Sequence, residues 1–155
     1  MTVKEALKFA IQYEIKSRNF YKILAASSKS EEAKKTFKSL IPLEKIHEEK
    51  LTEIYEKKFG VKPNGLDQEA FHKIRKDFIE TPMEILKFAV TLEEEASKMY
   101  RDMAEESDNP EAKELFEQLA EEESQHNEFI YLKMENLEGI AVWFDQSELA
   151  SHFEE

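Results

Sequence analysis

The sequence predicts an all-α protein: a four-helix bundle with a long crossover between the second and third helices and a short helix near the C-terminus. Three observations predict this fold. Apolar residues recur at alternating steps of three and four along four long segments, which is the spacing of helices that each bury one face. Helix-capping residues precede these segments. Finally, many residues of the first two segments recur 79 positions later without a gap, so one helix pair predicts a second.

The first two helices have clear starting signals. The motif Thr2-x-x-Glu5 is a capping box, in which the two side chains pair with free N–H groups of the first helical turn. It predicts a helix over roughly 3–27, and Ser30 predicts the start of a second helix over roughly 31–58. The link between them is short, so we expect the two helices to be antiparallel.

A longer segment, residues 59–80, separates the two helix pairs. Gly60 is expected to end the second helix, and Pro63-Asn64-Gly65 predicts a turn. Asp67 predicts the start of a short helix that continues through Ile79. A segment of about 20 residues suits a crossover that runs the length of the bundle, which would make the second and third helices parallel.

The second helix pair repeats the signals of the first. Thr81-Pro82-x-Glu84 is a capping box with proline at the first helical position, and it predicts a helix over roughly 82–106. Asn109, just before a proline, predicts the start of the fourth helix over roughly 110–136.

The chain divides into a bundle and a tail. The bundle is expected to span 1–137, with the two repeats at about 2–58 and 81–137. The tail, 138–155, has the motif Asp145-x-x-Glu148, which predicts a last short helix. We expect the tail to pack onto the bundle or onto a neighbouring subunit.

Each repeat has the same four polar residues within its apolar stripes. The first copy has Glu14, Tyr21, Glu44 and His47, and the second copy has Glu93, Tyr100, Glu123 and His126. Residues three apart on a helix differ by about 60° in direction and about 4.5 Å in rise, so both side chains of Glu-x-x-His can reach one ion. One glutamate plus a Glu-x-x-His motif, given twice, is a ligand set that holds two metal ions on a bundle axis.

Burial of these side chains makes metal binding the favoured interpretation. Four buried carboxylates without partners would cost many kcal/mol, or most of them would have to take up protons. Two divalent cations would neutralise them, and oxygen and imidazole donors suit iron or manganese, with zinc as a further candidate. We expect one ion on Glu44 and His47 and the other on Glu123 and His126, with Glu14 and Glu93 bridging or capping the pair.

A single Glu-x-x-His motif arises often by chance, but two copies in register, each preceded by a core-facing glutamate, favour a site. The contrasting interpretation is a repeat that retains the fold and has lost the metal. Tyr21 and Tyr100 are expected either to fill the core or to hydrogen-bond the ligands, and we expect no catalytic residue beyond the ligands. Residues predicted to face solvent are His72, Glu94, Glu95, Glu121, Glu122 and His152. Glu48, directly after His47, is expected to turn away from the ligands as well, with a supporting contact to a ligand as the alternative.

Composition excludes several classes of protein. The chain has no cysteine, so disulfides, thiolate metal sites and an internal rubredoxin module are excluded. A net charge of −12 argues against nucleic acid and anionic membranes as partners. No segment reaches the roughly 20 apolar residues of a membrane span, and the charged N-terminus does not resemble a signal peptide, so we expect a cytoplasmic protein.

In its two Glu-x-x-His motifs and the glutamate and tyrosine that precede each of them, the chain resembles the rubrerythrin branch of the ferritin-like di-iron carboxylate proteins. The resemblance covers roughly 5–135. The resemblance implies a carboxylate-bridged di-iron centre and tyrosines that hydrogen-bond its ligands. Two departures stand out. The chain has no rubredoxin domain, and Ala96 occupies the position of a further iron-ligating glutamate, which leaves a six-ligand set closer to that of bacterioferritin ferroxidase centres.

The expected function is that of a non-haem di-iron oxidoreductase that reduces hydrogen peroxide. Its cofactor would be two iron ions per chain, and its electrons would come from an external donor such as a separate rubredoxin. A ferroxidase or iron-handling protein, acting on oxygen, is the alternative within enzymes, and a non-catalytic metal-binding bundle is the alternative outside them. We expect a homodimer.

Overall fold

The computed structural model describes residues 2–74, 82–136 and 151–153. Its four long helices are α1 (Val3–Ala26), α2 (Glu31–Phe59), α3 (Pro82–Glu106) and α4 (Pro110–Asn136). The described residues contain no strand, so the all-α prediction is confirmed. The helix ends differ from the predicted ends by one residue at most.

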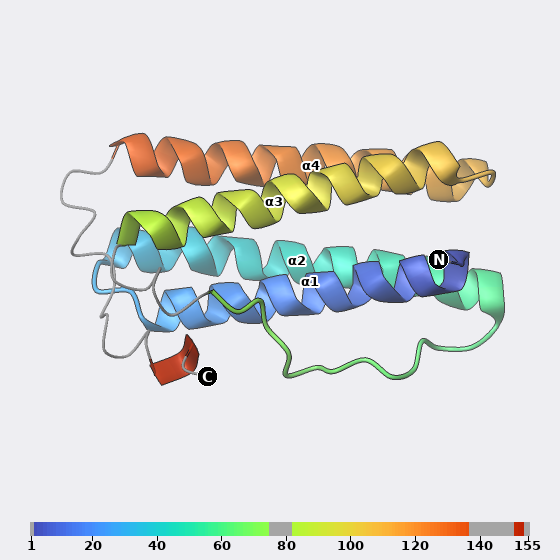
Figure 1. The fold of residues 1–155 in the computed structure, drawn as a ribbon, viewed down its shortest axis with the longest axis horizontal. Coiled ribbons are helices and arrows are strands. Elements are labelled where there is room, and N and C mark those ends of the chain that lie inside the picture. The colour runs from blue at the N-terminus through green and yellow to red at the C-terminus, as the bar shows by residue number, and fades with distance from the viewer. Residues whose placement is uncertain (1, 75–81, 137–150, 154–155) are drawn as a thin grey trace.

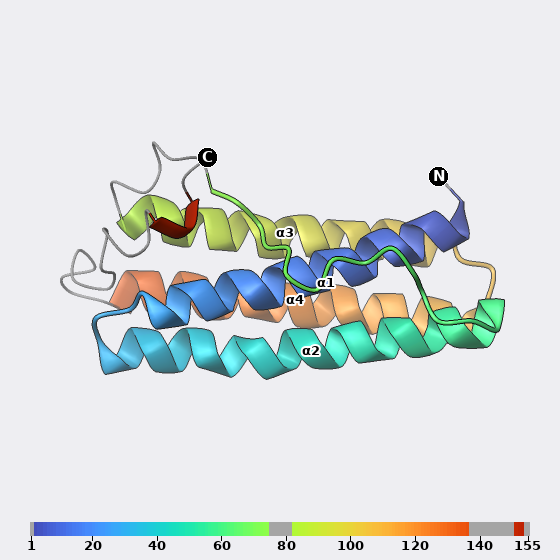
Figure 2. The same ribbon diagram turned by 90° about the horizontal axis from the view of Figure 1, so that it is seen from below.

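The helices form two antiparallel pairs, α1 with α2 and α3 with α4 (Figure 1). The segment after α2 returns along the length of α1 before α3 begins, as Figure 2 shows from below. α2 and α3 therefore run in the same direction, which confirms the predicted crossover and the ferritin-like connectivity.

Capping side chains set the helix ends. Thr2 and Glu5 form both bonds of the predicted capping box at the start of α1. The Ser30 hydroxyl accepts from a backbone N–H of the first turn of α2. Gly60 ends α2 with φ +73°, a left-handed conformation that glycine adopts without steric cost. Thr81, the predicted cap of α3, lies outside the described residues.

The path of the crossover is as predicted, but its local conformation is not. No helix forms over 67–74, where Asp67 caps only an isolated turn, and 75–79 lie outside the described residues. Side chains of α1 bind the crossover backbone instead. Gln12 pairs with the N–H and the carbonyl of Asp67 at 2.8 and 2.9 Å, and the Asn19 amide donates to two further carbonyls at 2.8 Å. These bonds satisfy an extended backbone, which therefore has no need of helical hydrogen bonds.

Two apolar clusters fill the bundle on either side of its middle. One includes Phe20, Phe37 and Leu86, and the other includes Leu7, Leu51 and Phe116. The buried polar side chains described below lie at mid-helix, between these clusters. No helix in the described part of the chain is long and apolar enough to cross a membrane.

The end of the tail packs onto the bundle. Residues 151–153 are helical, and Phe153 is buried against Phe20 and Phe71, with ring centroids 5.9 Å apart in both cases. The predicted cap, Asp145-x-x-Glu148, lies outside the described residues.

Candidate metal centre

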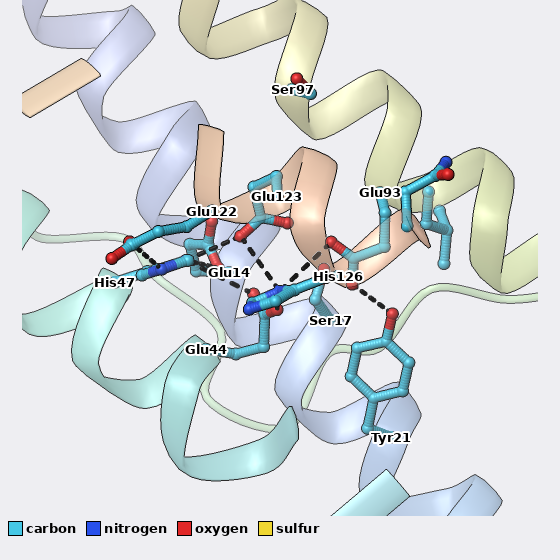
Figure 3. Close-up of polar contacts among 12 residues, drawn as sticks. Glu14, Ser17, Tyr21, Glu44, His47, Glu93, Ser97, Glu122, Glu123 and His126 are labelled. Atoms are coloured by element: carbon cyan, nitrogen blue, oxygen red, sulfur yellow. Dashed lines mark hydrogen bonds and ion pairs between the residues drawn. The ribbon is translucent and has the colours of Figure 1, made fainter. Parts of the chain in front are cut away.

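All six candidate ligands meet in one buried cluster at mid-bundle (Figure 3). Each of the four helices supplies a glutamate, and α2 and α4 each add a histidine one turn later. Their exposed fractions run from 0% for Glu14 and Glu44 to 8% for His126. Inward placement follows from the helical period, because each side chain lies on the apolar stripe of its helix.

The ligand atoms fall into two groups of four, in each of which the atoms lie within 4.8 Å of one another. The first group is Glu14, Glu44, His47 and Glu123, and the second is Glu44, Glu93, Glu123 and His126. The glutamates of the two Glu-x-x-His motifs therefore belong to both groups, whereas Glu14 and Glu93 each belong to one.

The internal repeat gives the cluster an approximate two-fold symmetry. His47 Nδ1 lies 3.6 Å from Glu14, and His126 Nδ1 lies 3.6 Å from Glu93. Each Nδ1 is also close to the Glu-x-x-His glutamate of the other pair: His47 to Glu123 at 2.7 Å, and His126 to Glu44 at 3.1 Å. Both imidazoles thus present Nδ1 to the carboxylates, and the rings stack with centroids 5.7 Å apart.

Two tyrosines connect the halves of the cluster. The Tyr21 hydroxyl donates to Glu93, and the Tyr100 hydroxyl donates to Glu14, each across to the other helix pair. Both side chains are fully buried, and burial raises the pKa of each hydroxyl well above its usual value. A neutral phenol is a hydrogen-bond donor, so each tyrosine fixes one carboxylate oxygen and leaves the other directed at the cluster.

Several ligand atoms of the cluster lie close to one another but form no hydrogen bond of normal geometry with the described residues. They are Glu14 Oε2, Glu44 Oε2, His47 Nδ1, Glu93 Oε2 and Glu123 Oε1. Buried polar atoms are nearly always paired, so five such atoms directed at one another need a common partner. Oxygen and imidazole donors around a shared space fit transition-metal cations such as iron, manganese or zinc.

Without metal, the pKa values of the four carboxylates are shifted in opposite directions. Burial and the charge of nearby carboxylates raise the pKa of Glu44 and of Glu123 well above the usual value. Burial also acts on Glu14 and Glu93, but the close approach of a neighbouring glutamate and a histidine outweighs it and lowers their pKa. The net pKa is thus raised for only two of the four carboxylates, whereas the sequence alone suggests that most of the four would take up protons.

Glu122 was predicted to face solvent, but in the structure it is turned toward His47. Its Oε2 lies 2.8 Å from His47 Nε2, across the seam between α4 and α2 (Figure 3). Burial alone would lower the pKa of His47, but the hydrogen bond with Glu122 and the nearby carboxylate of Glu14 outweigh it and raise the pKa to about 9. The available signal was position: Glu122 precedes His126 by four residues and so lies on the same face of α4.

Glu48 and His72 also differ from the prediction. Glu48 is buried between α1 and α2, where it forms an ion pair with Arg18. His72 is partly buried by the extended crossover, with its Nε2 3.0 Å from the Ser17 hydroxyl and its ring 4.4 Å from that of Tyr13. Burial lowers the pKa of His72 to about 4, so it is neutral at pH 7. The remaining solvent-facing predictions, Glu94, Glu95, Glu121 and His152, are exposed.

Comparisons with known proteins identify a family and a similar overall structure. A family model described as rubrerythrin matches the chain twice, over residues 5–83 and 84–151. A solved structure titled a hypothetical protein from Pyrococcus furiosus is similar, with 29% sequence identity and a TM-score of 0.73. The match covers 87% of this chain and 89% of that one. No curated protein matches the chain.

Proposed function

The chain belongs to the rubrerythrin family, and we propose that it is a non-haem di-iron oxidoreductase that reduces hydrogen peroxide with electrons from an external donor. The family and the buried carboxylate and histidine cluster together point to binding of two metal ions. One observation carries the proposal: the ligand atoms form two groups of four that share two glutamates.

The grouping suggests a role for each ligand. Glu44 and Glu123, which belong to both groups, would bridge the two ions. Glu14 and Glu93 would each cap one ion, so the capping alternative for these two residues is favoured over the bridging one. Two divalent cations would balance four carboxylates, and they would supply the partner that the unpaired donor atoms need.

When bound, two ferrous ions would supply the two electrons that convert one hydrogen peroxide and two protons into two water molecules. The protein's own part is positioning and exclusion of water. Tyr21 and Tyr100 hold the capping carboxylates, and the apolar clusters on both sides keep the cluster dry. Because the chain has no cysteine and no motif for a flavin or haem, we propose a separate electron donor such as a rubredoxin.

Ala96 keeps ferroxidase activity as the second candidate. This buried alanine occupies the position of a further iron-ligating glutamate in the resemblance to rubrerythrins, and the six remaining ligands suit oxidation of iron for storage equally well. The two functions differ in oxidant and in the amount of iron that the protein accumulates.

Stopped-flow oxidation of the reduced protein, loaded with two Fe(II) per chain and mixed with matched concentrations of peroxide or oxygen, tests the proposal. We expect peroxide to react faster, with about one turnover per centre unless a reduced rubredoxin is added. Faster reaction with oxygen, together with accumulation of ferric iron well beyond two ions per chain when further Fe(II) is supplied, would establish the ferroxidase instead. No reaction with either oxidant would leave a non-catalytic bundle.

A further inference from the structure

We propose that the two metal positions are unequal, and that Glu122 is the positioning residue that makes the position at His47 the tighter one. This inference rests on the metal binding of the proposed function. It concerns a side chain outside the ligand set, because Glu122 belongs to neither group of ligand atoms.

The first step is the orientation of His47. Its Nδ1 faces Glu14, Glu44 and Glu123 at 3.6, 3.9 and 2.7 Å, and its Nε2 lies 2.8 Å from Glu122 on the opposite side of the ring. An N–H donated to a carboxylate at Nε2 leaves the lone pair on Nδ1, directed at the cluster. Glu122 therefore fixes both the tautomer and the direction of the ring that a metal requires.

The second step is that this contact has no counterpart in the other half. The repeat offset of 79 residues places Leu43 where Glu122 stands, and Leu43 is 40% exposed and offers no acceptor. His126 presents its Nδ1 to the cluster as His47 does, but no described residue hydrogen-bonds to its Nε2.

The third step is that the ligand geometry is otherwise nearly the same in the two halves of the cluster. Each histidine lies 3.6 Å from its capping glutamate and 3.9 Å from the glutamate of its own motif, and each capping glutamate accepts from one tyrosine. Carboxylates that hydrogen-bond to ligating histidines typically contribute about 10- to 100-fold in metal affinity. We therefore expect a difference of about that size between the two positions.

Reciprocal substitutions test the inference. Apo-protein titrated with Co(II) in a calorimeter should bind in two steps whose affinities differ about 10- to 100-fold. Glu122→Leu, which copies the other half, should weaken the tight step until the two steps merge. Leu43→Glu should strengthen the weak step, an effect that a merely structural role of Glu122 would not produce. Glu122→Gln keeps an acceptor and should retain most of the difference, and Glu121→Gln, at an exposed neighbour, should match the unaltered protein.

A spectroscopic signature identifies the position. With one Co(II) per chain, the Nε2 proton of a bound His47 should give a paramagnetically shifted resonance whose exchange with water is slow because Glu122 holds the proton, and Glu122→Leu should abolish it. Two equal steps in the unaltered protein, or unchanged affinities in Glu122→Leu and Leu43→Glu, would overturn the inference and leave the proposed function standing. Absence of Co(II) binding in a helical protein would overturn both.

Discussion

Removal of metal should make the stability of the protein depend on pH between pH 7 and pH 9. The principal group is His47, whose pKa the neighbouring carboxylates raise from 6.5 to about 9. A histidine with a raised pKa contributes stability that is complete below its unfolded value and is lost as pH rises through its folded value. The raised pKa values of Glu44 and Glu123 act in the same direction, since deprotonation of a buried acid also destabilises the fold.

The size of the effect follows from linkage. For His47, a shift from 6.5 to about 9 contributes about 2.6 kcal/mol at pH 7 and about 0.4 kcal/mol at pH 9, a loss of about 2 kcal/mol. At roughly 2–4 °C per kcal/mol for a domain of this size, the melting temperature should fall by roughly 4–8 °C. Glu14 and Glu93, whose pKa values are lowered, contribute above their unfolded value of 4.5 and add no slope in this window.

The assay is thermal unfolding followed by circular dichroism on chelator-treated protein at both pH values. Zn(II)-loaded protein should lose the trend, because metal binds the deprotonated ligands and stabilises the fold. Apo-protein with His47→Gln should show a smaller fall, whereas His72→Gln should keep the full fall because His72 is already neutral across this range. A melting temperature of the unaltered apo-protein that stays flat or rises from pH 7 to pH 9 would refute the reasoning.

Two adjacent glutamates of α3 should behave differently: Glu93→Ala should lose at least one metal ion per chain in elemental analysis, and Glu94→Ala, at an exposed side chain, should keep the full content. Equal losses would mean that the helix face has been misassigned. Arg18→Met leaves Glu48 buried without its main partner and should lower the free energy of unfolding by about 3 kcal/mol in guanidinium titrations. Lys57→Met, which breaks an exposed ion pair, serves as its control and should leave the unfolding midpoint unchanged.

Features that depend on a single helix, such as where it ends and which side chains face inward, were predictable from the sequence. Helix ends depend on caps such as Thr2 and Ser30, and inward placement of Glu14 or His47 depends on the helical period, so both can be read along the chain. The repeat then predicts that two such helix pairs place their ligands at the same level of the bundle, as the structure has them.

The orientation of a side chain whose partner lies on a neighbouring helix was not predictable in the same way. Glu48 directly follows a ligand and Glu122 directly precedes one, and neither this position nor the four-residue spacing of Glu122 from His126 says which side chain each of them meets. Their direction is decided by Arg18 on α1 and His47 on α2, which only the packed bundle brings near. The crossover is a similar case, because its extended conformation depends on side chains of α1 that bind its backbone.

Metal stoichiometry tests the central claim most directly. Apo-protein should be reconstituted with excess Fe(II) without air, freed of unbound iron, and measured by elemental analysis beside its circular dichroism spectrum. The two overlapping ligand groups predict about two iron ions per chain. A value near zero in a protein that retains its helical spectrum would contradict the account, because the buried carboxylates and histidines would then have to be held together without a metal.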